Sequence, residues 1–390
     1  MSELPLAFAP ASQEARQRYR SHLTANYPAM NPAMAEAPLW MPYQHSKREF
    51  ESLVQSQYDL QLGLRAIMDA ALHDDRLRRL LTPRLDDDTV GQLALLEGVT
   101  LPTQFLRPDY IMDSRGHPQI CEINTRFIFN GNHIAVLLSQ ILSEYYEFET
   151  AYYDRLESYM HASYGGAGST LFLRGREPQH DLAIQKTLTP EGAEIAPQDL
   201  RFAQARKYGR IILELHQNEL RSVMHEVIRL VLDGVAVHND PRVVHILHDK
   251  RLLVALSDSE FMSEYVGAEV AERLAAAVVP SYHPSWPGRE PETMPGKRAL
   301  IKGAISGKGD NIGVVRVSTY RNVLEEPEYY VYQQWLTPRP IKNTSPDISI
   351  AGTLPMTLEG PVFGPGIIRV EDRRRLGGFR GFSIAVMENT

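Results

Sequence analysis

Cysteine is almost absent from the sequence, and Cys121 is the only one among 390 residues. A single thiol excludes an intrachain disulfide and any zinc site built from cysteines, and it favours a reducing compartment. The sequence has no apolar run of the length that spans a bilayer. Residues 1–10 lack the charged start and long apolar core of a signal peptide. We therefore expect a cytoplasmic protein with no membrane partner.

An excess of positive charge is missing as well. The 41 lysines and arginines are outnumbered by 48 aspartates and glutamates, which gives a formal net charge of −7. A dedicated nucleic-acid surface would be basic, so we expect no nucleic-acid partner. The three arginines at 373–375 are expected to form a solvated turn. Hydrophobic residues at 43% are ordinary for a globular protein, and the length allows two or three packed domains.

The spacing of apolar residues predicts the elements. Helical spacing recurs over residues 13–25, 47–81, where Pro83 marks the end, and 136–162. From residue 170 strands alternate with helices, which predicts a small α/β layer with a parallel sheet. In this layer strands are expected at 170–173, 210–215 and 235–238, and helices at 218–232, 241–256 and 259–277. Other strands are expected at 106–124 (as a pair), 298–303, 313–319 and 329–336, followed by a strand-and-loop tail at 337–390.

The most informative segment is the hairpin expected between residues 107 and 126. A turn centred on residues 115–116 is predicted because the glycine there can adopt positive φ. This register places Asp109 opposite Glu122 and Arg107 opposite Asn124. Side chains alternate along a strand, so these four share one face of the hairpin.

Two opposed carboxylates on this face are unfavourable unless a cation lies between them. Aspartate, glutamate and asparagine oxygens are the ligands that Mg²⁺ prefers, so the face is a candidate magnesium site. The alternative is an exposed hairpin with an ordinary charged face. The same register pairs Asp113 with Pro118 and turns Cys121 to the opposite face, where we expect it in the core.

A second candidate site is the glycine-rich loop between the strands that end at Lys302 and begin at Gly313. Its glycines fit neither a Walker A loop nor a dinucleotide fingerprint. Its backbone N–H groups could cover phosphates, with Lys302 as a nearby positive charge. The alternative is a glycine-rich hairpin with a surface lysine. Taken alone, Lys250 on its predicted helix and the apolar strand at 330–336 are also ordinary.

Together these motifs resemble the ATP-grasp superfamily. By this resemblance, Lys250 and Lys302 correspond to the two lysines that contact the nucleotide, and Ser306, Gly307 and Gly309 to the loop over its phosphates. Gln333, Gln334, Trp335 and Leu336 correspond to the hinge beside adenine. Asp109, Glu122 and Asn124 correspond to the magnesium ligands. Arg107, Arg126 and Arg369 correspond to catalytic arginines that face the transferred phosphoryl group and the acyl-phosphate.

The sequence departs from this family in two ways. Gln333 and Gln334 stand where acidic residues are common, which leaves the ribose contact unassigned. The hairpin also precedes the lysines, whereas the usual order places it last. This order resembles the circular permutation of glutathionylspermidine synthetase-like and eukaryotic glutathione synthetase-like proteins. The strand at 361–369 is then expected beside the hairpin, with Arg369 facing the phosphates.

The resemblance implies a mixed α+β and α/β protein: an ATP-grasp fold in permuted order, a small parallel α/β layer and an N-terminal helical region. Four parts are expected. They are an N-terminal helical region at 1–105, a metal-binding hairpin at 106–135, an α/β domain like those that precede the ATP-grasp at 136–295, and a nucleotide-binding grasp domain at 296–390.

The implied activity is an ATP-dependent carboxylate–amine ligase that uses Mg²⁺ and an acyl-phosphate intermediate. Its substrates would be a small-molecule or peptide-like carboxylate and an amine, which the sequence does not name. A phosphotransferase without ligation and a non-catalytic nucleotide-binding protein are the alternatives. A metal site at His238, His245 and His248 is disfavoured, because no further ligand spacing supports it. The sequence leaves open whether the chain forms a homodimer.

Overall fold

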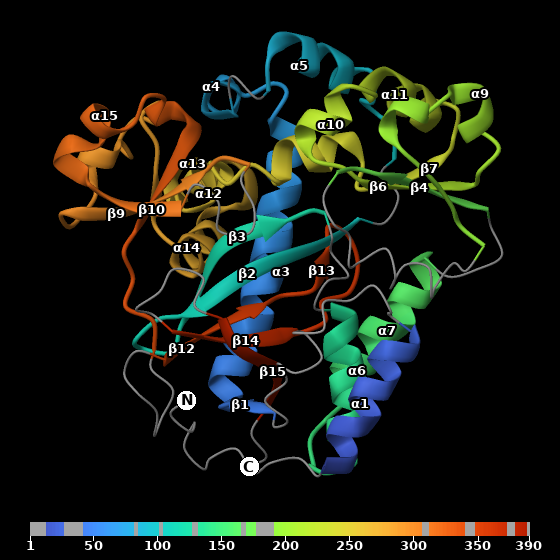
Figure 1. Cartoon of the computed structure of the whole chain (residues 1–390). Helices are drawn as coiled ribbons and strands as arrows, with labels where there is room; N and C mark the ends of the chain where they lie inside the picture. Colours follow the sequence, from blue (N-terminus) through green and yellow to red (C-terminus); the bar gives the residue numbers. More distant parts are fainter. Residues whose placement is uncertain are drawn as a thin grey trace.

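The computed structural model describes residues 13–26, 42–81, 85–100, 104–126, 132–164, 169–176, 191–305, 312–339, 348–372 and 379–387, which Figure 1 shows as helices, strands and connections. Ser306, Gly307 and Gly309 of the predicted phosphate loop lie outside these ranges, as do Pro83 and the arginines at 373–375. Within the described ranges, no helix combines the length and the apolar character that crossing a bilayer would need.

The N-terminal helices begin where the apolar spacing predicts. α1 spans Gln13–Asn26 and α3 spans Lys47–Ala70. Ser46 starts α3 with a capping box, since its hydroxyl accepts from the Glu49 N–H and the Glu49 carboxylate accepts from the Ser46 N–H. The predicted 47–81 helix is divided in two, since α3 ends at Ala70 and the next helix begins at Asp75. The following short helices are α4 (Asp75–Leu81) and α5 (Asp87–Ala94).

The central sheet joins strands from both ends of the chain. Its order is β1-β15-β14-β12-β2-β13, and β3 pairs with β2. The strands are β1 (Tyr43–His45), β2 (Phe105–Met112), β3 (Pro118–Asn124), β12 (Ile348–Thr353), β13 (Met356–Thr357), β14 (Ile367–Asp372) and β15 (Phe379–Met387).

Helices cover both faces of this sheet. Figure 1 shows α3 running along one face, and Ile368 of β14 packs in the same core as Leu60 of that helix. The neighbouring Ile367 points the other way, into a core with Leu138 and Tyr153. Those residues belong to α6 (Asn132–Leu142) and α7 (Ala151–Tyr164), which stand beside α1. The predicted 136–162 helix is therefore two helices.

The hairpin shares a sheet with the C-terminal strands, but its direct neighbour differs from the prediction. β12 pairs with β2, and β14 lies one strand further away. A glycine makes this close pairing feasible. A Cβ at Gly352 would lie 2.5 Å from the Tyr110 ring, so the aromatic side chain of β2 occupies the space that a larger residue in β12 would need.

The predicted parallel sheet is present. Its order is β5-β4-β6-β7, and all three pairings are parallel. The strands are β4 (Thr170–Arg174), β5 (Ala193–Ile195), β6 (Arg210–Glu214) and β7 (Ala236–His238). The helices are α9 (Phe202–Ala205), α10 (Gln217–Arg221) and α11 (Met224–Leu232), so the predicted 218–232 helix is also divided.

A third sheet has the order β10-β9-β11-β8. Its strands are β8 (Ser281–Tyr282), β9 (Arg298–Gly303), β10 (Ile312–Arg316) and β11 (Tyr330–Gln334). The helices near it are α12 (Leu252–Leu256), α13 (Ser259–Val266), α14 (Ala268–Ala277) and α15 (Tyr320–Val323). Gly267, at φ 81°, separates α13 from α14, so the predicted 259–277 helix is interrupted.

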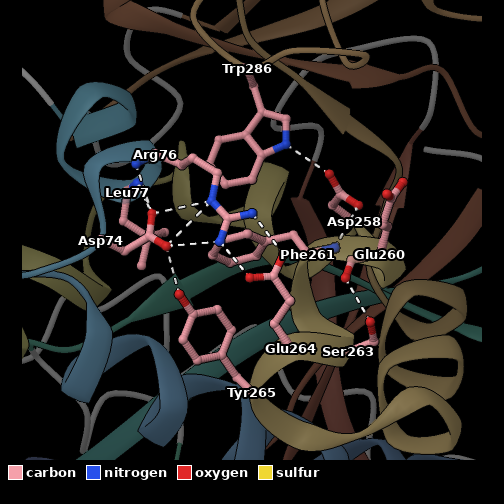
Figure 2. A network of polar contacts seen from close by, with 10 residues as sticks. All are labelled: Asp74, Arg76, Leu77, Asp258, Glu260, Phe261, Ser263, Glu264, Tyr265 and Trp286. Carbon is pink, nitrogen blue, oxygen red and sulfur yellow. Dashed lines mark hydrogen bonds and ion pairs between the residues drawn. The ribbon is translucent and has the colours of Figure 1, made fainter.

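A polar network fastens α4 to α13 (Figure 2). Arg76 binds the Glu264 carboxylate with two hydrogen bonds of 2.8 Å each, and its Nη2 also donates to Asp74 at 2.9 Å. Its guanidinium lies over the Phe261 ring, 4.4 Å from the centroid. Tyr265 donates to Asp74 at 2.6 Å. Planar guanidinium–carboxylate pairs of this kind add a defined geometry to the attraction between opposite charges. The network therefore holds α4 against α13.

This network predicts a dependence of stability on acid pH. Burial alone would raise the pKa of Asp74, but hydrogen bonds from Arg76, Tyr265 and the Leu77 N–H outweigh it and hold the pKa at about 2. A carboxylate with a lowered folded pKa stabilises the fold above its ordinary pKa of about 4, and this contribution is lost as pH falls toward 2. In Asp74→Asn, the free energy of unfolding measured in urea should therefore fall less steeply with decreasing pH over that range than in the parent chain.

The matched control is Asp75→Asn, which changes the same charge at the exposed neighbouring position. It should keep the steep dependence of the parent chain. An Asp74→Asn variant with the same slope as the parent would contradict the role given to Asp74.

Candidate functional site

The predicted face of the hairpin forms. Asp109 pairs with Glu122 and Arg107 pairs with Asn124, as the turn at Gly116 implied. Nearer the turn the register differs, because a bulge follows Asp109. Met112 therefore lies opposite Pro118, where Asp113 was predicted.

Cys121 is the extra residue of this bulge, and the prediction that it lies in the core was wrong. A bulged residue is left outside the regular ladder, and Cys121 is only half-buried. Its thiol contacts the Asp109 carbonyl at 3.4 Å, and burial raises the pKa of this thiol above its usual value. Its carbonyl oxygen accepts a hydrogen bond from Lys302 Nζ at 2.9 Å and contacts Gln333 Nε2 at 3.4 Å. The bulge thus joins the hairpin to β9 and β11.

Asp109 is almost completely buried, with 5% of the residue exposed. Arg369 Nη2 donates to one carboxylate oxygen at 2.9 Å. Arg107 Nε at 3.4 Å and Asn124 Nδ2 at 3.3 Å approach the other. Arg369 and Arg107 thus both approach Asp109, although β12 separates β14 from the hairpin. The buried negative charge is compensated by two guanidinium groups.

Glu122, on the opposite strand, forms an ion pair with Lys250. Lys250 Nζ lies 3.2 Å from Glu122 Oε1, and only 3% of the lysine side chain is exposed. The Lys250 N–H donates to the Ala304 carbonyl at 2.8 Å, directly after β9. Lys250 and Lys302 therefore both reach the hairpin, one through Glu122 and the other through the carbonyl of Cys121.

Lys250 does not lie on a continuous helix, contrary to the prediction for 241–256. A π-helix spans Val243–Leu247, and Lys250 sits in the turn before α12. Asn239, with φ 60°, has the left-handed backbone that precedes this segment, and its amide donates to the Leu213 carbonyl at 3.0 Å. Such π-helical turns and strained residues are frequent at functional sites.

Two neighbours of Lys250 were not predicted. Arg251 is fully buried and forms a 2.7 Å ion pair with Asp249. The same guanidinium donates to the Leu81 carbonyl at 2.7 Å. Buried arginine and aspartate at this spacing hold the turn that presents Lys250, so Asp249 and Arg251 position the candidate site. In the sequence these residues appear only as an Asp-Lys-Arg run, and such a charged run is ordinarily expected at the surface.

Arg126 is also buried, at 5% exposed, and its Nε donates to His248 Nε2 at 3.2 Å. His248 lies two residues before Lys250, so the end of the hairpin and the lysine turn are connected. His245 is separate: burial lowers its pKa to about 4, and among the described residues its Nε2 has no hydrogen-bond partner. Within the described ranges, neither histidine belongs to a group of three His, Cys, Asp or Glu side chains that could hold a metal ion.

The predicted hinge lies at the end of β11. Gln333 is buried and contacts Ser281 Oγ at 3.4 Å as well as the Cys121 carbonyl. Trp335, just past the strand, is 49% exposed, and Leu336 follows it. A cavity of about 500 Å³ is lined by Pro295, Gly296, Lys297, Arg298, Val314, Gln334 and Trp335. It combines an exposed indole and valine with basic side chains.

The residues present suit a hard cation, although the described residues contain no cluster of three His, Cys, Asp or Glu side chains. Asp109 and Glu122 lie directly opposite each other and Asn124 contacts Asp109. Two carboxylates and one amide would leave the other positions of an octahedral Mg²⁺ ion to water and substrate. The cations that now pair with both carboxylates show the need for compensating charge. The donor set therefore fits Mg²⁺.

Comparisons with known proteins agree with this fold. The structure is similar to a glutathione synthetase-like effector, GSS30, from Globodera pallida in its apo form, with a TM-score of 0.58 and 12% identity. The alignment covers 99% of this chain and 100% of that one. The family model described as the AnkG N-terminal domain matches residues 102–246, which is less than half of the chain. No curated protein matches the sequence. The fold is thus mixed α and β and similar to that of a glutathione synthetase-like protein.

Proposed function

We propose that the chain is an ATP-dependent carboxylate–amine ligase of the ATP-grasp type with its motifs in permuted order. The observation that carries this proposal is the convergence of three distant segments on one hairpin. Lys250, Lys302 and Arg369 each contact the β2–β3 pair within 3.2 Å, although they are more than 100 residues from it in sequence. Packing alone does not require so many buried charges in one place.

The distribution of charge supports a triphosphate as the ligand. When bound, ATP would supply the phosphoryl group that activates a carboxylate, and Mg²⁺ would offset phosphate charge. Asp109, Glu122 and Asn124 would hold the metal. Lys250 and Lys302 would bring two positive charges to the phosphate oxygens, in place of their present protein partners.

The cavity at the end of β11 supports a place for the base. Trp335 and Val314 are both exposed apolar side chains, and Gln334 adds an amide at its edge. A purine would bury part of the indole and the valine there. Gln333, held in the strand by contacts to Cys121 and Ser281, would fix the backbone beside it.

The arginines support chemistry at a carboxylate. Arg107 and Arg369 already bind a carboxylate, Asp109, and could orient a phosphoryl oxygen in the same way. Arg126, fixed through His248, would stabilise the negative charge that develops when an amine attacks an acyl-phosphate. Positioning and charge stabilisation account for most catalysis in phosphoryl transfer.

Trapping with hydroxylamine tests this function without knowing the natural amine. The full chain is incubated with Mg²⁺, ATP, hydroxylamine and amino acids or small peptides as carboxylates. We expect ADP and an acyl hydroxamate to form in equal amounts, because hydroxylamine attacks an acyl-phosphate as an amine would. ADP formation without any hydroxamate would contradict ligation and favour a phosphotransferase.

A further inference from the structure

A second cavity lies between α7 and the parallel sheet. It has a volume of about 490 Å³ and is lined by Tyr159, Ala162, Ser163, Gly209, Arg210, Ala236 and His238. This size lies in the range of small-molecule sites. Among the described residues, none of those proposed for nucleotide, metal or catalysis lines it.

The register of the strands explains why these side chains meet. Arg210 pairs with Ala236 and Ile212 pairs with His238, so all four point to one face of the sheet. Ile212 packs in the core that contains Leu156 and other α7 residues, which identifies the face that α7 covers. Towards the start of β6 the lining residues Gly209 and Ala236 are small, so the space between α7 and the parallel sheet remains open.

The polar groups of this cavity favour an anion. Arg210 supplies a permanent positive charge and His238, 4% exposed, a ring nitrogen. Tyr159 and Ser163 supply hydroxyls, and the described residues that line the cavity include no acid. Next to Arg210 on the same face is Thr170, 1% exposed, whose hydroxyl has no hydrogen-bond partner among the described residues. A buried hydroxyl in that position requires a partner.

We propose that this cavity binds a small organic carboxylate with a flat apolar body. A guanidinium binds a carboxylate with two parallel hydrogen bonds, and the hydroxyls can donate to the same group. The body would lie on Ala162, Gly209 and Ala236 beside the Tyr159 ring. The site is distinct from the proposed nucleotide site and does not depend on the proposed ligase activity.

Calorimetric titration of the full chain with benzoate, in the absence of nucleotide, tests the proposal. The parent chain should bind benzoate with an affinity in the millimolar range or better. Arg210→Gln should weaken binding at least about tenfold, since a charge-assisted pair is lost. Ala236→Leu should weaken it similarly by filling the cavity. Lys207→Gln, which removes an exposed charge close by in sequence, should leave it unchanged.

Three results with benzoate would overturn the site. The first is no binding by the parent chain at about 10 mM. The second is binding by Arg210→Gln or Ala236→Leu that equals binding by the parent chain, and the third is loss of binding in Lys302→Met, which would place the ligand at the nucleotide site. Benzamide, the neutral analogue, and inorganic phosphate should both bind at least about tenfold more weakly than benzoate. Equal binding of benzamide would exclude an anion site, and equal binding of phosphate would exclude a carboxylate-selective one.

Discussion

Replacing Glu122 with glutamine is expected to lower hydroxamate formation by at least about 100-fold, because charge stabilisation by a metal contributes several kcal/mol to the transition state. Glutamine keeps the size of the side chain and an oxygen that can accept from Lys250, which lies 3.2 Å away. It removes the negative charge that would hold Mg²⁺ opposite Asp109. The apparent affinity for Mg²⁺ should fall together with the rate.

This variant also leaves the positive charge of Lys250 buried without its anion, so stability must be measured in parallel. The matched control is Glu272→Gln on α14, an exposed carboxylate outside the hairpin. Its rate and magnesium dependence should equal those of the parent chain. Full activity of folded Glu122→Gln at saturating Mg²⁺ would remove the hairpin from the mechanism.

Replacing Lys302 with methionine is expected to weaken binding of a non-hydrolysable ATP analogue by at least about tenfold, since hydrogen bonds to charged groups contribute roughly 1.5–3 kcal/mol. Lys302 is 6% exposed, and its ammonium group donates a hydrogen bond to the carbonyl of Cys121. Methionine keeps the apolar stem that packs in the sheet, so loss of affinity would report the charge rather than the packing.

Lys47→Met is the matched control, because Lys47 is an exposed lysine at the start of α3, remote in sequence from the nucleotide motifs. It should bind the analogue as the parent chain does. If Lys302→Met binds it equally well, the strand that ends at Lys302 has no part in nucleotide binding.

The sequence predicted the hairpin well because its constraints are local. Alternation along two short strands and one glycine at the turn are enough to place Asp109 opposite Glu122. The bulge at Cys121 was not predictable, since its carbonyl is directed by Lys302 and Gln333 from strands far along the chain. A bulge that serves a tertiary contact leaves no signal in its own strand.

Other differences have the same kind of cause. The π-helix Val243–Leu247 is buried throughout, so its apolar residues give no period that would distinguish it from an α-helix. The sequence did not predict β12 as a separate strand within the tail at 337–390. Gly352 lowers the strand propensity of this segment, and its small size is needed only because the Tyr110 ring of another strand packs against it. The division into four parts, the magnesium and nucleotide contacts and the state of association remain predictions.

A crystal structure of the chain with Mg²⁺ and a non-hydrolysable ATP analogue would test the central claim most directly. We predict that the triphosphate lies between Lys250 and Lys302, that the metal contacts Asp109, Glu122 and Asn124, and that the base lies against Trp335. A nucleotide bound elsewhere, or a hairpin whose carboxylates keep their lysine and arginine partners and contact no metal, would contradict the account.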